Sequence, residues 1–202
     1  MLNETRDLLK NHGGLIAICF LFVFFSVFGQ SVFFGVYLPM IQHDLHLSKT
    51  VIGLLYAEAT IASSIVIMFT GKGLDHFPLR NFIVFVLCGL SLGCFVMAGA
   101  HTAVMLLLAF FLLRQFGQGL MMLSSSASIN RYLSENRGKA MALTTLGSSL
   151  QLLIFPLLAL HLDEYINWRQ AWIYYGIFIL IVLLPAFWMY LKSHQQTTHA
   201  RW

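Results

Sequence analysis

The sequence predicts an all-α integral membrane protein with six transmembrane helices. Its 202 residues are 58% hydrophobic and only 10% charged, whereas about a quarter of the residues of a soluble domain carry charge. Six apolar stretches also reach the length of about 20 residues that a helix needs to cross a bilayer. Too few charged side chains remain to cover a water-facing surface, and we therefore expect one helical bundle within the membrane.

The predicted spans follow one another with short connections, so consecutive helices should be antiparallel neighbours. They are Gly14–Met40, Thr50–Thr70, Asn81–Ala100, Ala103–Arg131, Gly138–Leu160 and Arg169–Lys192. The first is too long for a secretory signal, whose apolar core has about 7–15 residues, and no small-residue cleavage site ends it. Pro39 is expected to close the first helix, and Pro156 and Pro185 to bend the fifth and sixth.

The distribution of lysine and arginine predicts the orientation. With the N-terminus inside, nine of these residues lie on the cytoplasmic side and two on the outer side, as the positive-inside rule requires. The nine are Arg6, Lys10, Lys72, Arg80, Arg131, Arg137, Lys139, Lys192 and Arg201; the two are Lys49 and Arg169. We expect a cytoplasmic N-terminus (1–13), a bundle (14–192) and a disordered cytoplasmic tail (193–202). Short loops and the lack of a targeting extension favour a prokaryotic inner membrane, and the net charge of +4 does not indicate nucleic-acid binding.

The fourth span contains the most unusual residue, Arg114. A guanidinium near the membrane centre costs about 2.5–3.5 kcal/mol on insertion scales, so it should face a wet cavity or a partner. Polar or soft side chains follow it at helical spacing and predict one polar stripe: Gln118, Met121, Ser125 and Ser128. Gly117 and Gly119 beside the stripe would let another helix approach closely.

Other polar residues lie at membrane depth. Glu58 is about 12 Å from the outer end of the second helix and Arg114 about 16 Å from that of the fourth, so the two could pair. Glu58 could instead carry a proton or meet water at the outer mouth. Gln30, Gln151 and Tyr37 are further candidates for contact with a solute, and side-chain amides that link helices are the alternative interpretation.

Metal, cofactor and enzyme chemistry are not indicated. His43, Asp44 and His46 form a short outer loop that is more typical of solvated residues than of a metal site. All three cysteines lie in apolar spans, which argues against a disulfide framework or zinc site. The hydroxyls of 124–126 would suit an intramembrane serine protease, but no nucleophile elbow surrounds them and no buried base accompanies them. The phenylalanines of the first helix are expected to face lipid, and the tryptophans near helix ends to lie at the interfaces.

Four segments stand in the order of known signatures. They are GKGLDHFPLRN from Gly71, RQFGQG from Arg114, RYLSENRGKA from Arg131 and NWRQAW from Asn167. Together they resemble the major facilitator superfamily of secondary transporters. In the first segment Gly71, Asp75 and Arg80 match the core of that signature, whereas the residues at positions 76, 78 and 79 depart from it.

This resemblance covers essentially the whole chain but half of the family's architecture. It implies an N-terminal six-helix bundle of two inverted three-helix repeats, which transports a small solute by alternating access against a second bundle. That bundle would be a missing C-terminal half, another chain or a homodimer copy. The resemblance also implies a cytoplasmic gating latch of Asp75 and Arg80, extended to Arg131 or Arg137. Arg114 favours an anionic or zwitterionic solute. The segment from Arg131 to Ala140 is similar to monocarboxylate-type and oxalate/formate-type branches of the family, which favours an organic anion such as a monocarboxylate. A non-transporting truncated or regulatory half-bundle is the alternative.

Overall fold

The computed structural model describes residues 2–133 and 136–199, and within these ranges every regular element is helical. Six helical segments are long and apolar enough to cross a membrane. They are His12–Leu45, Lys49–Thr70, Leu79–Ala98, Ala103–Tyr132, Arg137–Leu162 and Trp168–Leu191. Each of the six predicted spans coincides with one of these helices and is thus confirmed. Helices suit a bilayer because their backbone groups are hydrogen-bonded internally.

Three of the six spans are interrupted by a short segment of another helix type. In chain order the elements are α1 (Leu2–Phe25), the 3₁₀ turn η1 (Ser26–Gly29), α2 (Ser31–Leu45), α3 (Lys49–Thr70), α4 (Gly73–His76), α5 (Leu79–Ala98), α6 (Ala103–Leu113), the π-helix η2 (Arg114–Met121), α7 (Met122–Tyr132), α8 (Arg137–Asp163), α9 (Trp168–Phe178), the π-helix η3 (Ile179–Leu183) and α10 (Leu184–His199). Such irregular turns are frequent at functional or strained positions.

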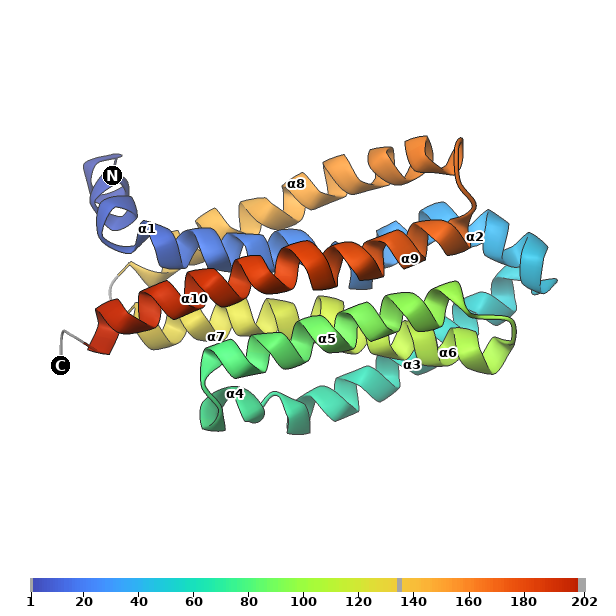
Figure 1. Ribbon diagram of the computed structural model, residues 1–202, viewed down its shortest axis with the longest axis horizontal. Helices are drawn as coiled ribbons and strands as arrows, with labels where there is room; N and C mark the ends of the chain where they lie inside the picture. Colours follow the sequence, from blue (N-terminus) through green and yellow to red (C-terminus); the bar gives the residue numbers. More distant parts are fainter. Residues whose placement is uncertain (1, 134–135, 200–202) are drawn as a thin grey trace.

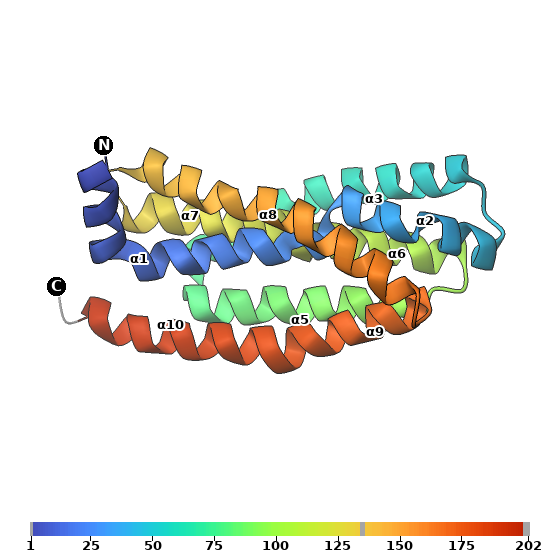
Figure 2. The same ribbon diagram turned by 90° about the horizontal axis from the view of Figure 1, so that it is seen from above.

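The helices lie side by side with their long axes roughly parallel (Figures 1 and 2). The start of α1 and the end of α10 lie at the same end of the bundle, which we call the terminal end; the opposite end holds the connections from α2 to α3 and from α8 to α9 (Figure 1). α1 packs against α7 and α8, α5 packs against α6 and α9, and α3 packs against α6.

The first span breaks where it crosses the fourth. Gln30 has extended backbone angles (φ −86°, ψ 140°) between η1 and α2. A side chain on Gly29 would clash with the backbone of Leu113 and Gln118, and a Cβ on Gly117 would lie 2.8 Å from the Gly29 nitrogen. Only glycines allow this backbone-to-backbone approach. The sequence predicted one unbroken helix from Gly14 to Met40, and that prediction is wrong.

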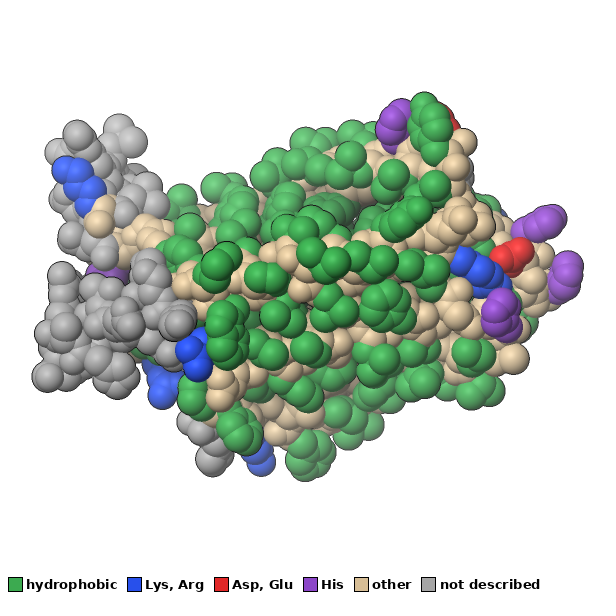
Figure 3. All heavy atoms as spheres, viewed as in Figure 1, with side chains coloured by type: hydrophobic (Ala, Val, Ile, Leu, Met, Phe, Trp, Pro, Cys, Tyr) green, Lys and Arg blue, Asp and Glu red, His purple; other side chains and the backbone are tan. Residues whose placement is uncertain are grey.

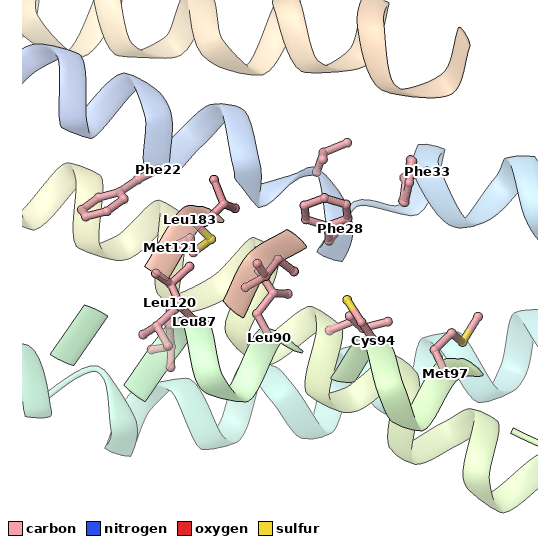
Figure 4. Packing of buried hydrophobic residues seen from close by; sticks show 14 of the residues in the cluster. Phe22, Phe28, Phe33, Leu87, Leu90, Cys94, Met97, Leu120, Met121 and Leu183 are labelled. Carbon is pink, nitrogen blue, oxygen red and sulfur yellow. The ribbon is translucent and has the colours of Figure 1, made fainter. Parts of the chain in front are cut away.

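Aromatic side chains fill the interior around this crossing. Phe22, Phe28 and Phe33 are at most 1% exposed, and Figure 4 shows them on the first span, opposite Leu90 and Cys94. Trp172 is fully buried, with its ring centroid 5.6 Å from that of Phe33. The expectation that the first-helix phenylalanines face lipid is thus wrong for Phe22, and the interfacial expectation is wrong for Trp172, because both fill the core.

Two predictions about helix ends are also corrected. Pro39 lies inside α2, which continues to Leu45; ending a helix at membrane depth would leave backbone groups without partners. α10 continues to His199, so a disordered tail from residue 193 is wrong for 193–199, and 200–202 lie outside the described residues. The π-helix η3 ends two residues before Pro185, whose missing N–H and bulky ring disfavour regular α-helical bonding there.

The surface is divided along the bundle axis. On the face drawn in Figure 3, hydrophobic side chains cover the middle, and basic side chains lie mainly at the terminal end. At the opposite end a basic group lies beside an acidic one, among histidines (Figure 3). This banded surface is the one that a bilayer-spanning bundle requires.

Candidate functional site

Arg114 is the first residue of η2, near the middle of the fourth span. Its guanidinium carbon lies 5.2 Å from the centroid of the Tyr56 ring on α3. Among the described residues, no hydrogen bond or ion pair joins the Arg114 side chain to another group. The half-buried cation is thus held by a cation–π contact, which leaves its planar fork of N–H donors available.

The Tyr56 ring is itself fixed by aromatic neighbours. Its centroid lies 5.4 Å from that of Phe110 and 5.7 Å from that of Phe34. Phe110 precedes Arg114 by four residues on the same span. The Tyr56 ring therefore contacts both the guanidinium and the helical turn that precedes it. Tyr56 was not predicted as a site residue, although an aromatic ring two residues before Glu58 was a usable signal.

Glu58 does not pair with Arg114. Its side chain is exposed on α3, and no ion pair links the two groups in the part of the chain that the structure describes. Equal depth in the membrane did not bring them together, because Glu58 lies on the outer face of α3 and Tyr56 occupies the position beside the guanidinium.

Two polar atoms near Arg114 are buried with no hydrogen-bond partner in the part of the chain that the structure describes. They are the Tyr56 hydroxyl and Oε1 of Gln118, and Gln118 follows Arg114 by four residues within η2. Buried polar groups are nearly always hydrogen-bonded, so each unpartnered atom calls for an explanation. A cation with open donors, a hydroxyl and a carbonyl oxygen together could bind a small polar solute.

Gln30 lies at the break in the first span and faces the same crossing. Its Nε2 lies 3.7 Å from the Met122 sulfur, which is a weak acceptor, and the side chain is half-buried. The structure thus places Gln30 near η2, with most of its hydrogen-bonding capacity unused.

Gln151 and Tyr37 lie inside the bundle and are not on an open face. Gln151 is 1% exposed and accepts a hydrogen bond of 3.4 Å from Ser26. Tyr37, also 1% exposed, shares a hydroxyl contact of 2.6 Å with Tyr175 on α9. Of the two interpretations for these residues, their geometry fits interhelical linkage, since each joins two spans.

The lower part of the predicted polar stripe is also internal. Met121, Ser125 and Ser128 are at most 2% exposed. The Ser125 hydroxyl donates to the Cys19 carbonyl oxygen on α1 at 3.0 Å, and the Ser128 hydroxyl donates within its own helix to Ser124. These residues thus face a partner helix within the bundle, because α7 packs this side against α1.

Gln115 is an important polar residue that the sequence interpretation missed. It is 2% exposed, accepts a hydrogen bond from Ser63 at 3.0 Å and donates one to Thr70 at 2.8 Å. Both partners lie on α3, so one side chain joins η2 to α3 at two points. The available signal was the pair of hydroxyl residues seven positions apart, which places them on one face of the second span.

Arg169 lies at the end opposite the termini, and its side chain has several polar partners within the protein. Arg169 Nη1 donates to the Ala100 carbonyl oxygen at 2.9 Å, and Nη2 lies 3.4 Å from both Asp44 Oδ2 and His101 Nδ1. Its guanidinium also stacks 4.2 Å from the Trp168 ring, whose Nε1 donates to Asp44 at 3.0 Å. This network ties together α2, the α5–α6 connection and α9. Asp44 is thus engaged here, and the described residues hold no group of three potential metal ligands.

The predicted gating residues lie at the terminal end. Gly71 follows α3, where a Cβ would lie 2.8 Å from a Leu123 methyl group, so it allows α3 to approach α7. Arg80 stacks 4.2 Å from the Trp188 ring, and its Nε is buried with no hydrogen-bond partner among the described residues. The Asp75 side chain lies outside the described residues, so the latch with Arg80 stays a prediction. Arg131 and Arg137 are exposed on either side of the connection from α7 to α8.

Comparison with known proteins gives one match. The family profile described as Major Facilitator Superfamily matches residues 19–201, which is most of the chain. Neither the curated proteins nor the solved structures contain a match to the chain.

Proposed function

The chain belongs to the Major Facilitator Superfamily, a family of membrane transporters, and from this premise we propose that it moves a small organic anion across the bilayer. The carrying observation is the Arg114 guanidinium, which lies at mid-membrane beside Tyr56 with no polar partner among the described residues. An intramembrane charge is costly, and such residues usually line a pathway for substrate or ions. The fork of N–H donors matches a carboxylate in both charge and geometry.

In this proposal Arg114 binds the anionic group, and Tyr56, Gln118 and Gln30 contribute neutral hydrogen bonds around it. The buried Tyr56 hydroxyl supports this assignment, because it can donate to a carboxylate oxygen. Gln118 Oε1 is an acceptor, so it would need a donor such as a hydroxyl elsewhere on the solute. A monocarboxylate has the right charge and number of acceptors for one guanidinium. Tyr37 and Gln151, being engaged between spans, would support the site without touching the solute.

We further propose that the bundle works against a second six-helix bundle by alternating access, through inverted repeats typical of such folds. The burial pattern supports a partner: over an 18-residue apolar stretch, only 17% of α3 is buried, and 28% of both α8 and the sixth span, against 56% of α5. Glu58 is exposed on α3, and a carboxylate on a lipid-facing surface would be costly. We propose that the partner covers this face, whether it is a further part of the protein, another chain or a second copy.

The basic residues at the terminal end support an orientation with that end in the cytoplasm, as in a prokaryotic inner membrane. In this orientation Asp75 and Arg80 would form the cytoplasmic gate, extended to Arg131 or Arg137. A half-bundle that regulates or assembles with other proteins, without transporting, is the alternative that the same unburied α3 and α8 faces allow.

Uptake into proteoliposomes tests the proposal. The gene product is reconstituted and assayed with radiolabelled monocarboxylates, with a dicarboxylate and with a neutral sugar. We expect saturable uptake of a monocarboxylate, a loss of about 100-fold or more in Arg114→Gln, and partial recovery in Arg114→Lys, which keeps the charge but not the fork. Lys49→Gln removes an exposed charge at the end opposite the termini and is the matched control for charge. Equal uptake by wild type and Arg114→Gln would refute the assigned role, and a failure of every solute to accumulate would favour the non-transporting alternative.

A further inference from the structure

A second candidate site lies at the terminal end, far from Arg114. An open hollow of about 480 Å³ is lined by two short stretches of chain. Its lining residues are Leu74 and Leu79 from around α4 and α5, and Ala127, Ser128, Asn130, Arg131 and Tyr132 from α7. Asn130 follows Arg114 by 16 residues, or about 24 Å along the helix. The hollow therefore does not belong to the proposed solute site.

The depth of the hollow follows from the length of the fourth span. Ala103–Tyr132 has 30 residues and is about 45 Å long, whereas the hydrocarbon core of a bilayer is about 30 Å thick and the headgroup layers extend it to about 40–45 Å. Asn130, Arg131 and Tyr132 are the last residues of this span. They therefore lie at the level of lipid headgroups.

The charge around the hollow favours an anion. Segments 71–80 and 130–139 contribute five of the seven lining residues, and their sequences contain five lysines and arginines and two acidic residues, Asp75 and Glu135. Arg80 stacks on Trp188, and Lys72 and Lys139 have interactions of their own. Arg131, by contrast, is exposed at the hollow and has no ion pair among the described residues.

The lining contains both polar and apolar side chains. Arg131 offers a planar pair of donors suited to phosphate, and Asn130 and Tyr132 are also exposed lining residues with polar groups. Leu74, Leu79 and Ala127 contribute apolar surface. A free anion would leave that apolar surface unused, whereas the phosphate and glycerol end of a lipid would contact both parts.

We propose that this hollow is a binding site for an anionic phospholipid, with the lipid phosphate on Arg131 and the glycerol and first acyl carbons against Leu74, Leu79 and Ala127. Basic pockets at a membrane surface attract anionic headgroups, at about 1 kcal/mol per cation. The site requires only that the bundle is in a membrane. It is independent of which solute the protein moves.

The test compares lipids and variants by native mass spectrometry of the detergent-purified protein. Wild type is titrated with phosphatidylglycerol and with phosphatidylcholine of the same acyl chains. We expect at least fivefold tighter binding of phosphatidylglycerol, and a loss of about fivefold in Arg131→Gln, the factor that corresponds to one cation. Arg137→Gln removes the same charge outside the hollow and should change binding less than twofold. Equal losses in both variants would show a diffuse effect of surface charge and would overturn the proposal.

Two further experiments are needed. One distinguishes the effect of the shape of the hollow from that of its charge, and the other distinguishes a lipid ligand from free phosphate. Ala127→Phe places a bulky side chain among the apolar lining residues and keeps every cation, so it should also lower phosphatidylglycerol binding about fivefold. Unchanged binding would overturn the proposed position of the lipid. Circular dichroism confirms that each variant is folded. Inorganic phosphate at 100-fold excess over lipid should not displace phosphatidylglycerol from wild type. Full displacement would reassign the hollow to small anions and overturn the lipid proposal.

Discussion

Arg114 and Arg169 are two arginines of one bundle in opposite situations. Arg169 lies at an end of the membrane span, where it contacts a backbone carbonyl oxygen, a carboxylate, an imidazole and an indole ring. Arg114 lies at mid-span and contacts one aromatic ring. Of the two, Arg169 lies where a charge costs less free energy and has more partners. Arg114 lies where a charge costs more and has fewer.

This contrast separates two roles for the same side chain. An arginine whose donors are used within the protein stabilises the fold, as Arg169 does by tying three segments together. An arginine whose donors are unused at a site of high cost lowers stability, and it persists only where it performs some other task. The glutamines follow the same division, since Gln115 has two partners whereas Oε1 of Gln118 has none.

The largest expected effect concerns the crossing that positions Arg114. Gly29→Leu would push a side chain into the backbone of Leu113 and Gln118, so we expect a loss of more than about 3 kcal/mol in the free energy of unfolding. Gly35→Leu is the control, because nothing lies within 4 Å of the Cβ position there, and it should cost less than about 1 kcal/mol. Unfolding in mixed detergent micelles, followed by circular dichroism, measures both; equal costs would mean that the glycine contact does not fix the crossing.

The two arginines themselves give the next largest effect. Arg169→Gln should lower the free energy of unfolding by about 1.5–3 kcal/mol, because it removes hydrogen bonds of a charged group and leaves Asp44 without its cation. Arg114→Gln should leave stability unchanged or raise it, because it removes an intramembrane charge that has no polar partner. Both are measured by the same unfolding titration. A loss in Arg114→Gln as large as in Arg169→Gln would make Arg114 a structural residue.

The glutamine pair extends the contrast to neutral groups. Gln115→Leu removes two hydrogen bonds to α3 and leaves Ser63 and Thr70 without that partner, so we expect it to cost about 1–3 kcal/mol. Gln118→Leu removes an oxygen that has no partner and should change stability by less than about 0.5 kcal/mol. Thermal unfolding of the two variants side by side decides this, and a reversed order would contradict the assignment of linking and unpartnered glutamines.

The smallest expected effect is at Tyr56. Tyr56→Phe keeps the ring beside Arg114 and removes a buried hydroxyl without a partner, so stability should be unchanged or slightly higher. Tyr56→Leu loses the ring and should cost about 0.5–2 kcal/mol, the range of cation–π contacts. In protein that also carries Arg114→Gln, the difference in unfolding free energy between Tyr56→Phe and Tyr56→Leu should be smaller, because the cation–π contact is already lost. An unchanged difference would mean that the ring acts only through Phe34 and Phe110.

The positions of the spans could be predicted from sequence because the bilayer imposes a length of about 20 apolar residues on each. The break at η1 could not, since Ser26–Gly29 lies within a long, largely apolar span and contains no proline. Its cause is a partner glycine almost ninety residues away. Gly117 was recognised as a position of close approach, but its counterpart Gly29 could be found only in three dimensions.

The candidate site was predictable in its centre and not around it. Arg114 is a charge in an apolar run, which the sequence displays directly. Its neighbour could not be identified by depth alone: Glu58 and Tyr56 differ by two residues, but they lie on different faces of α3, and only Tyr56 contacts the guanidinium. Gln115 was overlooked because regular helical spacing favoured Gln118.

The π-helix η2 has a consequence for how the fourth span meets its neighbours. An α-helix turns by about 100° per residue, whereas a π turn, bonded from residue i to i+5, needs more residues to complete the same rotation. The halves above and below η2 are therefore out of phase. α6 directs its buried side to α3 and α5, and α7 directs its own to α1. One span thus packs against different helices on the two sides of η2, and Arg114 lies where the angular register of the span changes.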